Sequence, residues 1–310
     1  MSYKHFTLNE RNKIEVLNKE GYSSRRIAKI LGCHHSTIAR ELKRCKNNYK
    51  AHTAEEDKKH KSSLKGRKNK STKEIICTII EKLNLRWSPE QIAGTLYKGK
   101  LTFKTIYNWI YSGIIDFDIS KLRRKGKSRN NKETRGRFNI GTSIRKRPKS
   151  IKDRNTFGHW ELDTVVSSRG KSKGCLATFV ERKTRFYIAL PIKNRSKDSM
   201  FKAIKKLCNT LPKESLKSFT SDRGKEFACY DEVEKFGIDF YFADPYSAWQ
   251  RGSNENSNGL LREYYPKKTD LAEISIEELI KNLMELNNRP RKCLNYRTPF
   301  DLFLHELSLI

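Results

Sequence analysis

Apolar residues recur at helical spacing in three short segments near the start of the chain. The first begins at a Thr-Leu-Asn-Glu capping-box pattern (7–10) and ends at Gly21. The second covers 24–31 and the third 35–44, and a glycine lies between them. Two helices joined by a glycine-containing turn, with a small residue such as Ala28 where they cross, are typical of a helix-turn-helix unit.

The outward positions of the third segment carry side chains that suit base edges and phosphates. These candidate DNA contacts are His34, His35, Thr37, Arg40, Lys43 and Arg44. A plain three-helix bundle with a basic, solvated face is the alternative. We therefore predict a helix-turn-helix DNA-binding domain over 1–50.

A Lys-rich stretch over 51–73 has few apolar residues and predicts a basic linker or a frayed helix. A second helical unit follows over 74–117, in which Ser-Pro-Glu-Gln at 88–91 is a strong helix start. A later helix of this unit turns polar side chains outward, namely Lys104, Thr105 and Asn108. We predict a second helix-turn-helix-like domain that contacts DNA; in the alternative, Trp109 and Tyr111 simply belong to a core.

The pattern changes again towards the end of the chain. Residues 118–154 are rich in Lys, Arg, Asn, Ser and Gly, which predicts a basic linker that follows phosphates. From 155 to 310 we expect a catalytic-type domain with a helical tail. Its expected elements are strands at 158–167, 174–181, 185–191, 215–221 and 238–243, and helices at 198–211, 229–236 and 253–265. Three strands followed by alternating helices and strands give the order of an α/β ribonuclease-H-like fold, a mixed sheet flanked by helices.

Charge indicates which partners suit this layout. The 310 residues carry 66 Lys+Arg against 35 Asp+Glu, a net charge of +31. Residues 1–150 hold 38 basic and 13 acidic side chains, whereas residues 151–310 hold 28 and 22. A basic front half joined to a nearly balanced back half indicates a nucleic-acid-binding arm attached to another activity. A ribosomal-type basic protein and a membrane-surface binder are the alternatives on charge alone.

Composition also excludes several classes. No run of 18 apolar residues is present, so we expect neither a membrane span nor a secretory signal. The seven cysteines stand singly with no C-x-x-C pair, which argues against a disulfide scaffold or a zinc ribbon. We therefore expect a cytoplasmic protein.

Three acids stand at the ends of expected elements in the back domain. Asp163 lies in the first strand, Asp222 directly follows the fourth, and Glu255 begins the last helix. The first and fourth strands are neighbours in a ribonuclease-H-like sheet, so their acids meet at one edge and an adjacent helix offers a third. Hard divalent ions prefer such oxygen ligands. Taken singly, each acid is more often a cap, turn or surface residue, and Glu161 lies on the same strand face as Asp163.

Four strings extend this pattern. They are Gly-His-Trp-Glu-Leu-Asp at 158–163, Ser-Asp-Arg-Gly-Lys-Glu-Phe at 221–227, Pro-Tyr-Ser-Ala-Trp-Gln-Arg-Gly-Ser-Asn-Glu-Asn-Ser-Asn-Gly at 245–259, and Asn-Arg-Pro-Arg-Lys-Cys-Leu-Asn-Tyr-Arg-Thr-Pro at 288–299. Together they resemble the insertion-sequence-30 family of bacterial transposases over nearly the whole chain. The one visible departure is Leu162, where relatives usually have glycine; it alternates away from the acidic face.

The resemblance implies a DDE triad of Asp163, Asp222 and Glu255 that binds two Mg²⁺ or Mn²⁺ ions. It also implies an enzyme that recognises the terminal inverted repeats of an insertion sequence, cleaves DNA and transfers the 3′ hydroxyl into target DNA. Its partners would be double-stranded DNA and further copies of the chain, with no membrane and no small-molecule substrate, in the bacterial cytoplasm at the nucleoid. Arg251 and Arg262 are added candidates for phosphate contact, although Arg262 is equally suited to be a surface cation.

Two other functions remain open at this point. One is a DNA-binding regulator whose ribonuclease-H-like domain is catalytically silent, for which the three acids need not converge. The other is a nuclease of the same fold that cuts DNA without joining it.

Overall fold

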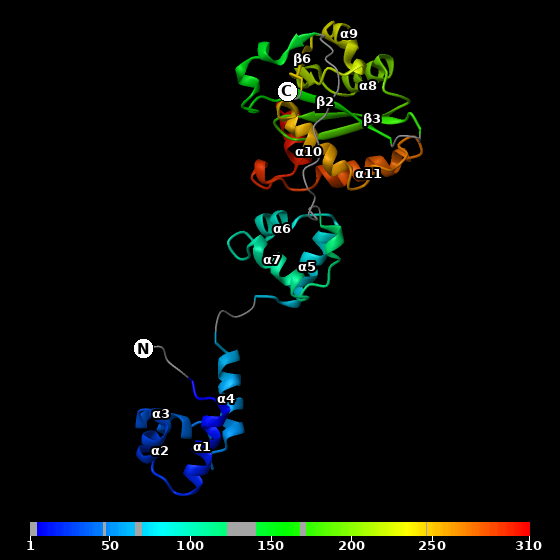
Figure 1. Cartoon of the computed structure of the whole chain (residues 1–310). Coiled ribbons are helices and arrows are strands. Elements are labelled where there is room, and N and C mark those ends of the chain that lie inside the picture. The colour runs from blue at the N-terminus through cyan, green and yellow to red at the C-terminus, as the bar shows by residue number, and fades with distance from the viewer. Residues whose placement is uncertain (1–4, 46–47, 66–69, 123–140, 168–171, 246) are drawn as a thin grey trace. The chain divides into compact units, whose positions relative to one another are not determined.

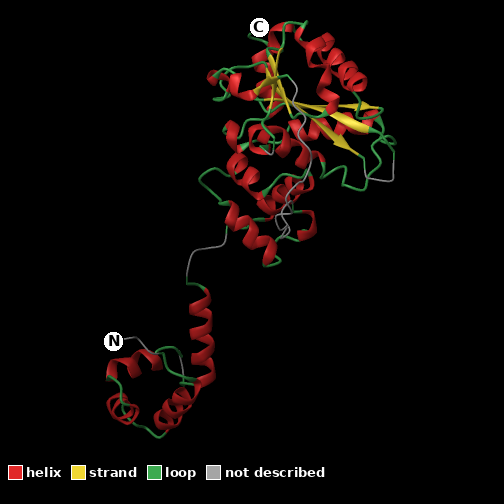
Figure 2. Ribbon diagram, turned by 45° about the horizontal axis from the view of Figure 1, so that its top comes forward, coloured by secondary structure: helices red, strands yellow, loops and turns green. Residues whose placement is uncertain are grey.

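The computed structural model describes residues 5–45, 48–65, 70–122, 141–167, 172–245 and 247–310. The chain divides into two compact units, Met1–Ser71 (unit 1) and Thr72–Ile310 (unit 2), drawn in Figure 1 from blue to red along the chain. Figure 2 shows that unit 1 is helical throughout, whereas unit 2 contains a sheet with helices around it. No helix in the described ranges has the length and apolar composition to cross a membrane.

The described residues of unit 1 form four helices. They are α1 (Leu8–Lys19), α2 (Ser24–Leu31), α3 (His35–Leu42) and α4 (Ala51–Ser63). The capping box at the start of α1 is present in full, with the Thr7 side chain and the Glu10 side chain each accepting from the other's backbone N–H. Gly32 ends α2 at φ 63°, the left-handed conformation that permits the tight turn into α3. Ile14, Ile27 and Ile38 fill the core between the first three helices.

Helix α4 corrects the expectation of a linker or frayed helix over 51–73. Its small residues Ala51 and Ala54 are buried, and Ala54 belongs to the core of unit 1. Its acids, Glu55 and Asp57, pair with Arg11 and Arg44 of the first three helices. The segment looks like a linker because its contacts are ionic rather than apolar, and ion pairs leave no hydrophobic period in a sequence.

Unit 2 begins with three helices, α5 (Lys73–Asn84), α6 (Pro89–Leu96) and α7 (Phe103–Tyr111). Ser88 and Gln91 form the expected capping box with Pro89 at the first turn of α6. Trp109 is buried in the core of this bundle, whereas Tyr111 is 62% exposed. The alternative assignment of these two aromatics is therefore correct for Trp109 only.

This helical segment docks on the C-terminal part of the same unit. The Arg86 guanidinium donates to the Glu263 carbonyl at 2.7 Å, and the Gln91 side chain donates to the Pro290 carbonyl at 2.7 Å. Gly94 of α6 lies directly against the Tyr296 ring, where any larger residue would overlap it.

A six-stranded mixed sheet forms the centre of unit 2. Its strands lie in the order β1-β6-β5-β2-β3-β4. Their bounds are β1 (Thr142–Ser143), β2 (His159–Val166), β3 (Cys175–Glu181), β4 (Tyr187–Ile192), β5 (Ser218–Ser221) and β6 (Asp239–Phe242). Strands β2, β3 and β4 form an antiparallel meander, whereas β5 pairs with β2 in parallel. The first and fourth strands of the expected ribonuclease-H-like domain are thus neighbours, as predicted.

Helices cover both faces of this sheet (Figure 1). On one face α8 (Lys197–Thr210), α9 (Tyr230–Glu234) and α12 (Pro299–Leu307) join a core that includes Trp160, Leu162 and Phe219. On the other face α10 (Gly252–Leu261) and α11 (Ile276–Asn287) pack on Val165, Leu176 and Val180. Leu162 is fully buried in the first core, which agrees with its expected direction away from the acidic face.

Short 3-10 turns connect these elements. They are Ile119–Lys121, Ile144–Lys146, Lys149–Ile151, Lys213–Ser215, Lys225–Cys229, Ala248–Arg251 and Lys292–Leu294.

The expected linker over 118–154 is only partly described, because 123–140 lie outside the described residues. Its last part is not a linker. Strand β1 pairs in parallel with β6, Ile151 is buried, and the Arg147 guanidinium donates to the Thr220 hydroxyl at 3.1 Å. A two-residue strand is too short to show a period of two, so the basic composition conceals it.

Candidate active site

Asp163 lies on β2, and Asp222 directly follows the neighbouring strand β5. In the parallel pairing of β2 with β5, Glu161 stands opposite Thr220. Asp163 and Asp222 each lie two residues further along the chain, so both carboxylates reach the same edge of the sheet. Burial, with a smaller effect of repulsion by Asp222, raises the pKa of Asp163.

The guanidinium of Arg251 stands between these two carboxylates. Its Nη1 lies 3.5 Å from Asp163 Oδ2, and its Nη2 lies 3.3 Å from Asp222 Oδ2. Nη1 also donates to the Leu162 carbonyl at 3.1 Å. The positive charge lowers the pKa of Asp163 against the stronger effect of burial. Arg251, expected to contact DNA, therefore acts as the counter-ion of the aspartate pair in this structure.

Further hydrogen bonds fix the orientation of both carboxylates. Asp163 accepts from the side-chain amide of Asn258 at 3.0 Å and from the backbone N–H of Thr164 at 2.8 Å. The Tyr187 hydroxyl donates to the other end of the Asn258 side chain at 2.8 Å. Asp222 accepts from the backbone N–H of Gly224 at 3.0 Å, the tight turn expected of Asp followed by Arg-Gly.

Glu255 lies on α10 and is exposed. Asn258 follows it by three residues on the same helix, so these two side chains are neighbours on its surface. Arg251 is the N-cap residue that precedes the helix, and both Arg251 and Asn258 contact Asp163. The structure thus brings Asp163 and Asp222 to one guanidinium, with Glu255 on the adjoining helix.

Glu161, the alternative acid on β2, is already paired. It is fully buried, accepts from Arg182 at 2.6 Å, and accepts from the backbone N–H of Asn254 at 3.0 Å. Its carboxylate fixes the start of α10 and is closed to solvent. Asp163, with 24% of its side chain exposed, is the acid of β2 that a ligand can reach.

A second buried acid supports the site and was not singled out by the sequence reasoning. The Glu226 carboxylate accepts from the Thr164 hydroxyl at 2.6 Å and pairs with Arg195. Thr164 directly follows Asp163, so this network fixes the end of β2. Glu226 lies four residues after Asp222 in the quoted string 221–227, which was the only signal for it.

The donor set of this edge suits a hard divalent ion. Asp163, Asp222 and Glu255 offer only carboxylate oxygens, the ligands that Mg²⁺ and Mn²⁺ prefer. The Arg251 guanidinium shows that a positive charge is accommodated between the first two. Over the described residues, however, no three His, Cys, Asp or Glu side chains already stand together as a metal cage.

The predicted DNA contacts of unit 1 are placed mostly at the surface. His34, His35, Arg40 and Lys43 are exposed and Thr37 is half-buried. His34 caps α3, its ring accepting from the Ser36 backbone N–H. Arg44 differs, because its guanidinium is bound to Glu41 at 2.8 Å and to Asp57 at 2.7 Å. That side chain holds α3 and α4 together.

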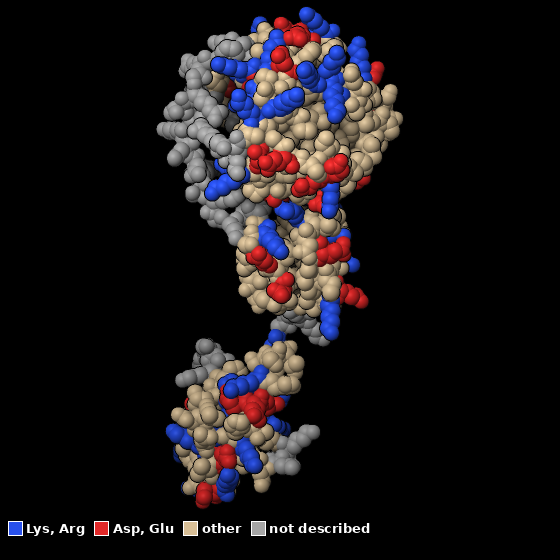
Figure 3. All heavy atoms as spheres, turned by 90° about the vertical axis from the view of Figure 1, so that its right-hand side faces the viewer, with Lys and Arg blue, Asp and Glu red and all other residues tan. Residues whose placement is uncertain are grey.

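The remaining candidates lie in unit 2. Lys104 and Asn108 are exposed on α7, and the Thr105 hydroxyl lies 3.0 Å from that of Thr102. Arg262 donates to the Val166 carbonyl at 2.7 Å and to the Tyr265 carbonyl at 3.3 Å. Its guanidinium therefore links α10 to the end of β2. On the face that Figure 3 shows, Lys and Arg side chains are mixed with acids over each unit rather than forming one uniform sheet of positive charge.

Comparison with known proteins agrees with this architecture. Residues 2–45 match the helix-turn-helix domain family, and residues 153–248 match the integrase core domain family, a metal-dependent domain. A crystal structure of the catalytic core domain of BIV integrase aligns with 50% of this chain and 98% of that one, at 18% identity and a TM-score of 0.39.

Curated relatives match along almost the entire chain. The transposase InsI for insertion sequence element IS30C of Escherichia coli is 36% identical over 329 aligned residues, covering 98% of this chain and 85% of the relative. The transposase for insertion sequence element IS4351 of Bacteroides fragilis is 33% identical, covering 97% and 95% respectively. The chain therefore belongs to the insertion-sequence-30 family of transposases, and it is a DNA transposase with an integrase-type catalytic core.

Proposed function

We propose that this transposase binds the terminal inverted repeats of its insertion sequence, cuts the element's ends and joins each freed 3′ hydroxyl to target DNA. The observation that carries the proposal is the pair Asp163 and Asp222, held side by side at an open sheet edge with Glu255 on the adjoining helix face. The basic helix-turn-helix unit supports binding to a defined site, since its third helix exposes polar and cationic side chains.

We assign Asp163, Asp222 and Glu255 as the catalytic, metal-binding residues. When bound there, two Mg²⁺ or Mn²⁺ ions would activate the attacking oxygen and stabilise the leaving oxygen. Asn258 and Thr164 orient the Asp163 carboxylate, and Gly224 orients that of Asp222. Because these contacts are fixed before substrate arrives, the carboxylates need little reorganisation during the reaction.

The two steps exchange phosphodiester bonds. In cleavage, the oxygen of water bonds to phosphorus and the bond from phosphorus to the 3′ oxygen breaks. That oxygen takes a proton to become a hydroxyl, and the other fragment retains a 5′ phosphate. In joining, the 3′ oxygen bonds to a target phosphorus, displaces the target's own 3′ oxygen and passes its proton to it. No oxidation or reduction occurs, and no protein side chain forms a bond to DNA.

Assembly follows from the geometry of the reaction. Two element ends and one target must meet, whereas one chain carries one aspartate pair at the β2–β5 edge. We propose that copies of the chain assemble on DNA in the cytoplasm, at the nucleoid. Sedimentation of the full chain with an end-bearing duplex should give a complex with more than one protein copy; a strictly monomeric complex that still joins two ends would contradict this.

Strand transfer by the full-length protein tests the catalytic proposal. A labelled duplex that ends in the element's inverted repeat is incubated with plasmid DNA and Mg²⁺. Asp222→Asn removes one carboxylate charge with little change in shape and should abolish both cleavage and joining. Asp231→Asn is the matched control, because this acid is exposed on α9, across the sheet from α10.

The reaction products distinguish a transposase from a nuclease and from a catalytically silent copy. Joined product from Asp222→Asn at the wild-type level would refute the assignment of the site. A wild-type protein that cuts the end but never joins it would identify a nuclease instead of a transposase of this mechanism. Protein that binds the end yet does neither would identify a catalytically silent copy.

A further inference from the structure

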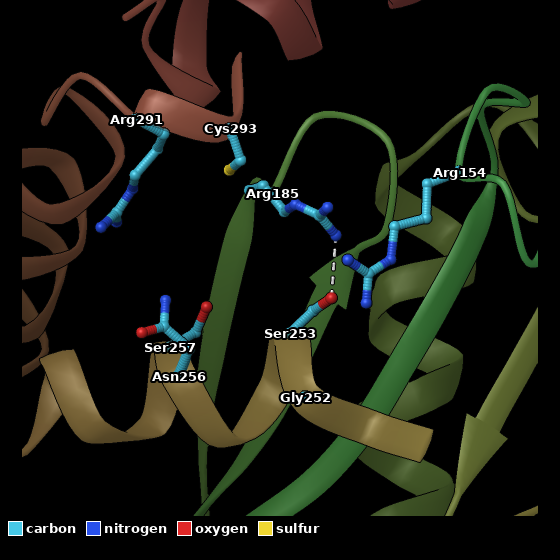
Figure 4. Close-up of a pocket in the computed structure, with 8 residues that line it drawn as sticks. All are labelled: Arg154, Arg185, Gly252, Ser253, Asn256, Ser257, Arg291 and Cys293. Atoms are coloured by element: carbon cyan, nitrogen blue, oxygen red, sulfur yellow. Dashed lines mark hydrogen bonds between the residues drawn. The ribbon is translucent and has the colours of Figure 1, made fainter. Parts of the chain in front are cut away.

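A cationic pocket lies beside α10, away from the aspartate pair. Its cavity volume is about 190 Å³. The lining residues are Arg154, Arg185, Gly252, Ser253, Asn256, Ser257, Arg291 and Cys293. Figure 4 shows the side chains of the three arginines around the space above α10, with the serines on the helix below. They come from three separate segments, one before β2, one in the turn between β3 and β4, and one after α11.

The charge of this pocket is not balanced by its own lining. Three guanidinium groups line it, and none of the eight lining residues is an acid. Arg185 donates to the Ser253 hydroxyl at 2.8 Å, a neutral partner. Arg154 is half-buried and makes no hydrogen bond or ion pair with any described residue. Burial, with a smaller effect of Arg185, lowers the pKa of Arg154, and nearby Glu161 opposes that shift.

The backbone fixes both arginines in an unfavourable conformation. Arg154 has a φ of 59° and Arg185 a φ of 64°. This left-handed region is uncommon for residues other than glycine and asparagine, and it persists only where the surroundings determine it. Two such residues that place neighbouring guanidinium groups against one cavity point to a ligand-binding role.

The pocket and the aspartate pair lie on opposite faces of the same helix. Ser253, Asn256 and Ser257 face the pocket, while Arg251 and Asn258 contact Asp163. With 3.6 residues per turn these two sets lie about half a turn apart, and an α-helix with its side chains is about 10–12 Å across. A group held in the pocket therefore belongs to a nucleotide other than the one at the aspartate pair.

The N-terminus of α10 adds to the attraction for an anion. Its first residue, Gly252, leaves open space where a side chain would stand, although the third, Asn254, already donates its backbone N–H to Glu161. The positive end of the helix dipole favours a phosphate oxygen beside Gly252.

We infer that this pocket binds a phosphodiester of the DNA backbone, held by Arg154, Arg185 and Arg291 at a nucleotide away from the scissile bond. This inference rests on the proposed function, since it takes DNA as the substrate. The pocket holds the strand while α10 presents Glu255 on its other side. Arginine forks match phosphate oxygens better than lysine does, which suits a site that positions rather than merely attracts DNA.

Salt-dependent binding of the full chain to an end-bearing duplex, measured without divalent ions, tests the pocket. Arg154→Asn removes one cation, and asparagine tolerates the left-handed φ of 59° at this position. The variant should lower affinity about 5- to 10-fold and reduce the salt slope by about one. Lys152→Gln, an exposed residue of the same segment, is the control for a generic loss of charge and should keep the affinity within about twofold.

Neutral methylphosphonate linkages, placed one at a time along the duplex, locate the contact. One linkage should weaken binding by the wild type more than binding by Arg154→Asn, because one of the three arginines that contact its charge is gone. Arg154→Lys should restore part of the affinity, because lysine restores the charge but not the two-pronged guanidinium contact with phosphate oxygens. If circular dichroism shows that Arg154→Asn does not fold, Arg185→Asn takes its place, since its φ of 64° allows the same substitution.

Two results would overturn the inference. One is an unchanged affinity and salt slope in Arg154→Asn, with every methylphosphonate acting as in the wild type. The other is a thermal stabilisation of the wild type by inorganic phosphate, lost in Arg154→Asn, with an unchanged methylphosphonate pattern; this would assign the pocket to free phosphate. Strand transfer by the wild type in Mg²⁺ is run in parallel. If it joins DNA while the pocket variants bind normally, only this inference fails, whereas a wild type that neither cuts nor joins refutes the proposed function.

Discussion

Removal of Arg251 should make the metal-free protein less stable and should raise its affinity for a divalent metal ion. The guanidinium lies 3.5 Å from Asp163 and 3.3 Å from Asp222. At an effective dielectric constant of about 20, unit charges at such a distance attract by about 5 kcal/mol. Exposed fractions of 24% for Asp163 and 38% for Asp222 reduce this towards the value of about 1 kcal/mol that exposed pairs reach. We therefore expect Arg251→Gln to cost about 2 kcal/mol in the absence of divalent ions.

Thermal unfolding measures both effects. In a chelator, about 2 kcal/mol in a unit of this size corresponds to a melting temperature lower by about 4–8 °C. Titration with Mn²⁺ should then stabilise Arg251→Gln at an about tenfold lower metal concentration than the wild type, because the ion no longer displaces a guanidinium. Arg262→Gln is the matched control; it removes a cation from the same helix region that donates to carbonyls rather than to either aspartate.

The prediction assumes that the Arg251 guanidinium and the metal ion compete for the same place, and two results would refute it. If Arg251→Gln requires the same Mn²⁺ concentration as the wild type, or a higher one, Arg251 does not occupy the place of the ion. If Arg262→Gln shifts the Mn²⁺ response as far as Arg251→Gln does, the effect is a general loss of positive charge. The double variant with Asp222→Asn should lose the metal response altogether.

Three other substitutions test the fold of the two units. Burial, with a smaller effect of nearby Lys and Arg, lowers the pKa of His159 from 6.5 to about 4; the unfolded chain therefore binds the extra proton between these pH values, and stability should fall by about 3 kcal/mol as the pH drops through them. Denaturant melts at about pH 7 and about pH 4.5 should show a smaller pH effect for His159→Asn than for the wild type. Gly94→Ala places a methyl group on the Tyr296 ring, so limited proteolysis should detect release of α6 from the C-terminal segment; an unchanged digestion pattern would contradict that docking. Arg11→Met leaves Glu41, buried at 5% exposure, with Arg44 as its remaining cation, which should cost about 2–3 kcal/mol and lower the helicity of unit 1 at a given denaturant concentration.

Local patterns in the sequence predict most of the fold. The alternation and order of apolar stretches after 155 predicted the meander and the β2–β5 neighbourhood, because each strand there is long enough or buried enough to be seen. Caps at Thr7 and Ser88 marked helix starts, since capping depends on residues three apart in the chain. The sequence does not predict elements that depend on partners distant along the chain or that are very short. Helix α4 depends on Arg11, 44 residues before Glu55, and strand β1 has only two residues.

The order of the strands predicts that Asp163 and Asp222 meet, but it does not predict the residues that surround them. Which acid of β2 is open to solvent depends on Arg182 and on the Asn254 backbone, both distant in sequence from Glu161. Arg251 was expected to contact DNA because the sequence shows only that it is a cation in a basic protein. Its position between two carboxylates depends on how α10 crosses β2 and β5, which no spacing along the chain reveals.

Helix α10 connects these observations. Its buried positions are Ser253, Asn254 and Ser257 in the first turns and Leu260 and Leu261 at the end, so hydrogen bonds hold its start and apolar packing holds its end. Thr178 donates to the Asn254 side chain at 3.3 Å, and the Asn254 backbone donates to Glu161. A helix fixed in this way presents polar groups on both faces: Asn258 towards Asp163, and the serines towards the arginine pocket. The near-neutral balance of residues 151–310 therefore conceals an acidic edge and a cationic pocket, separated by the width of one helix.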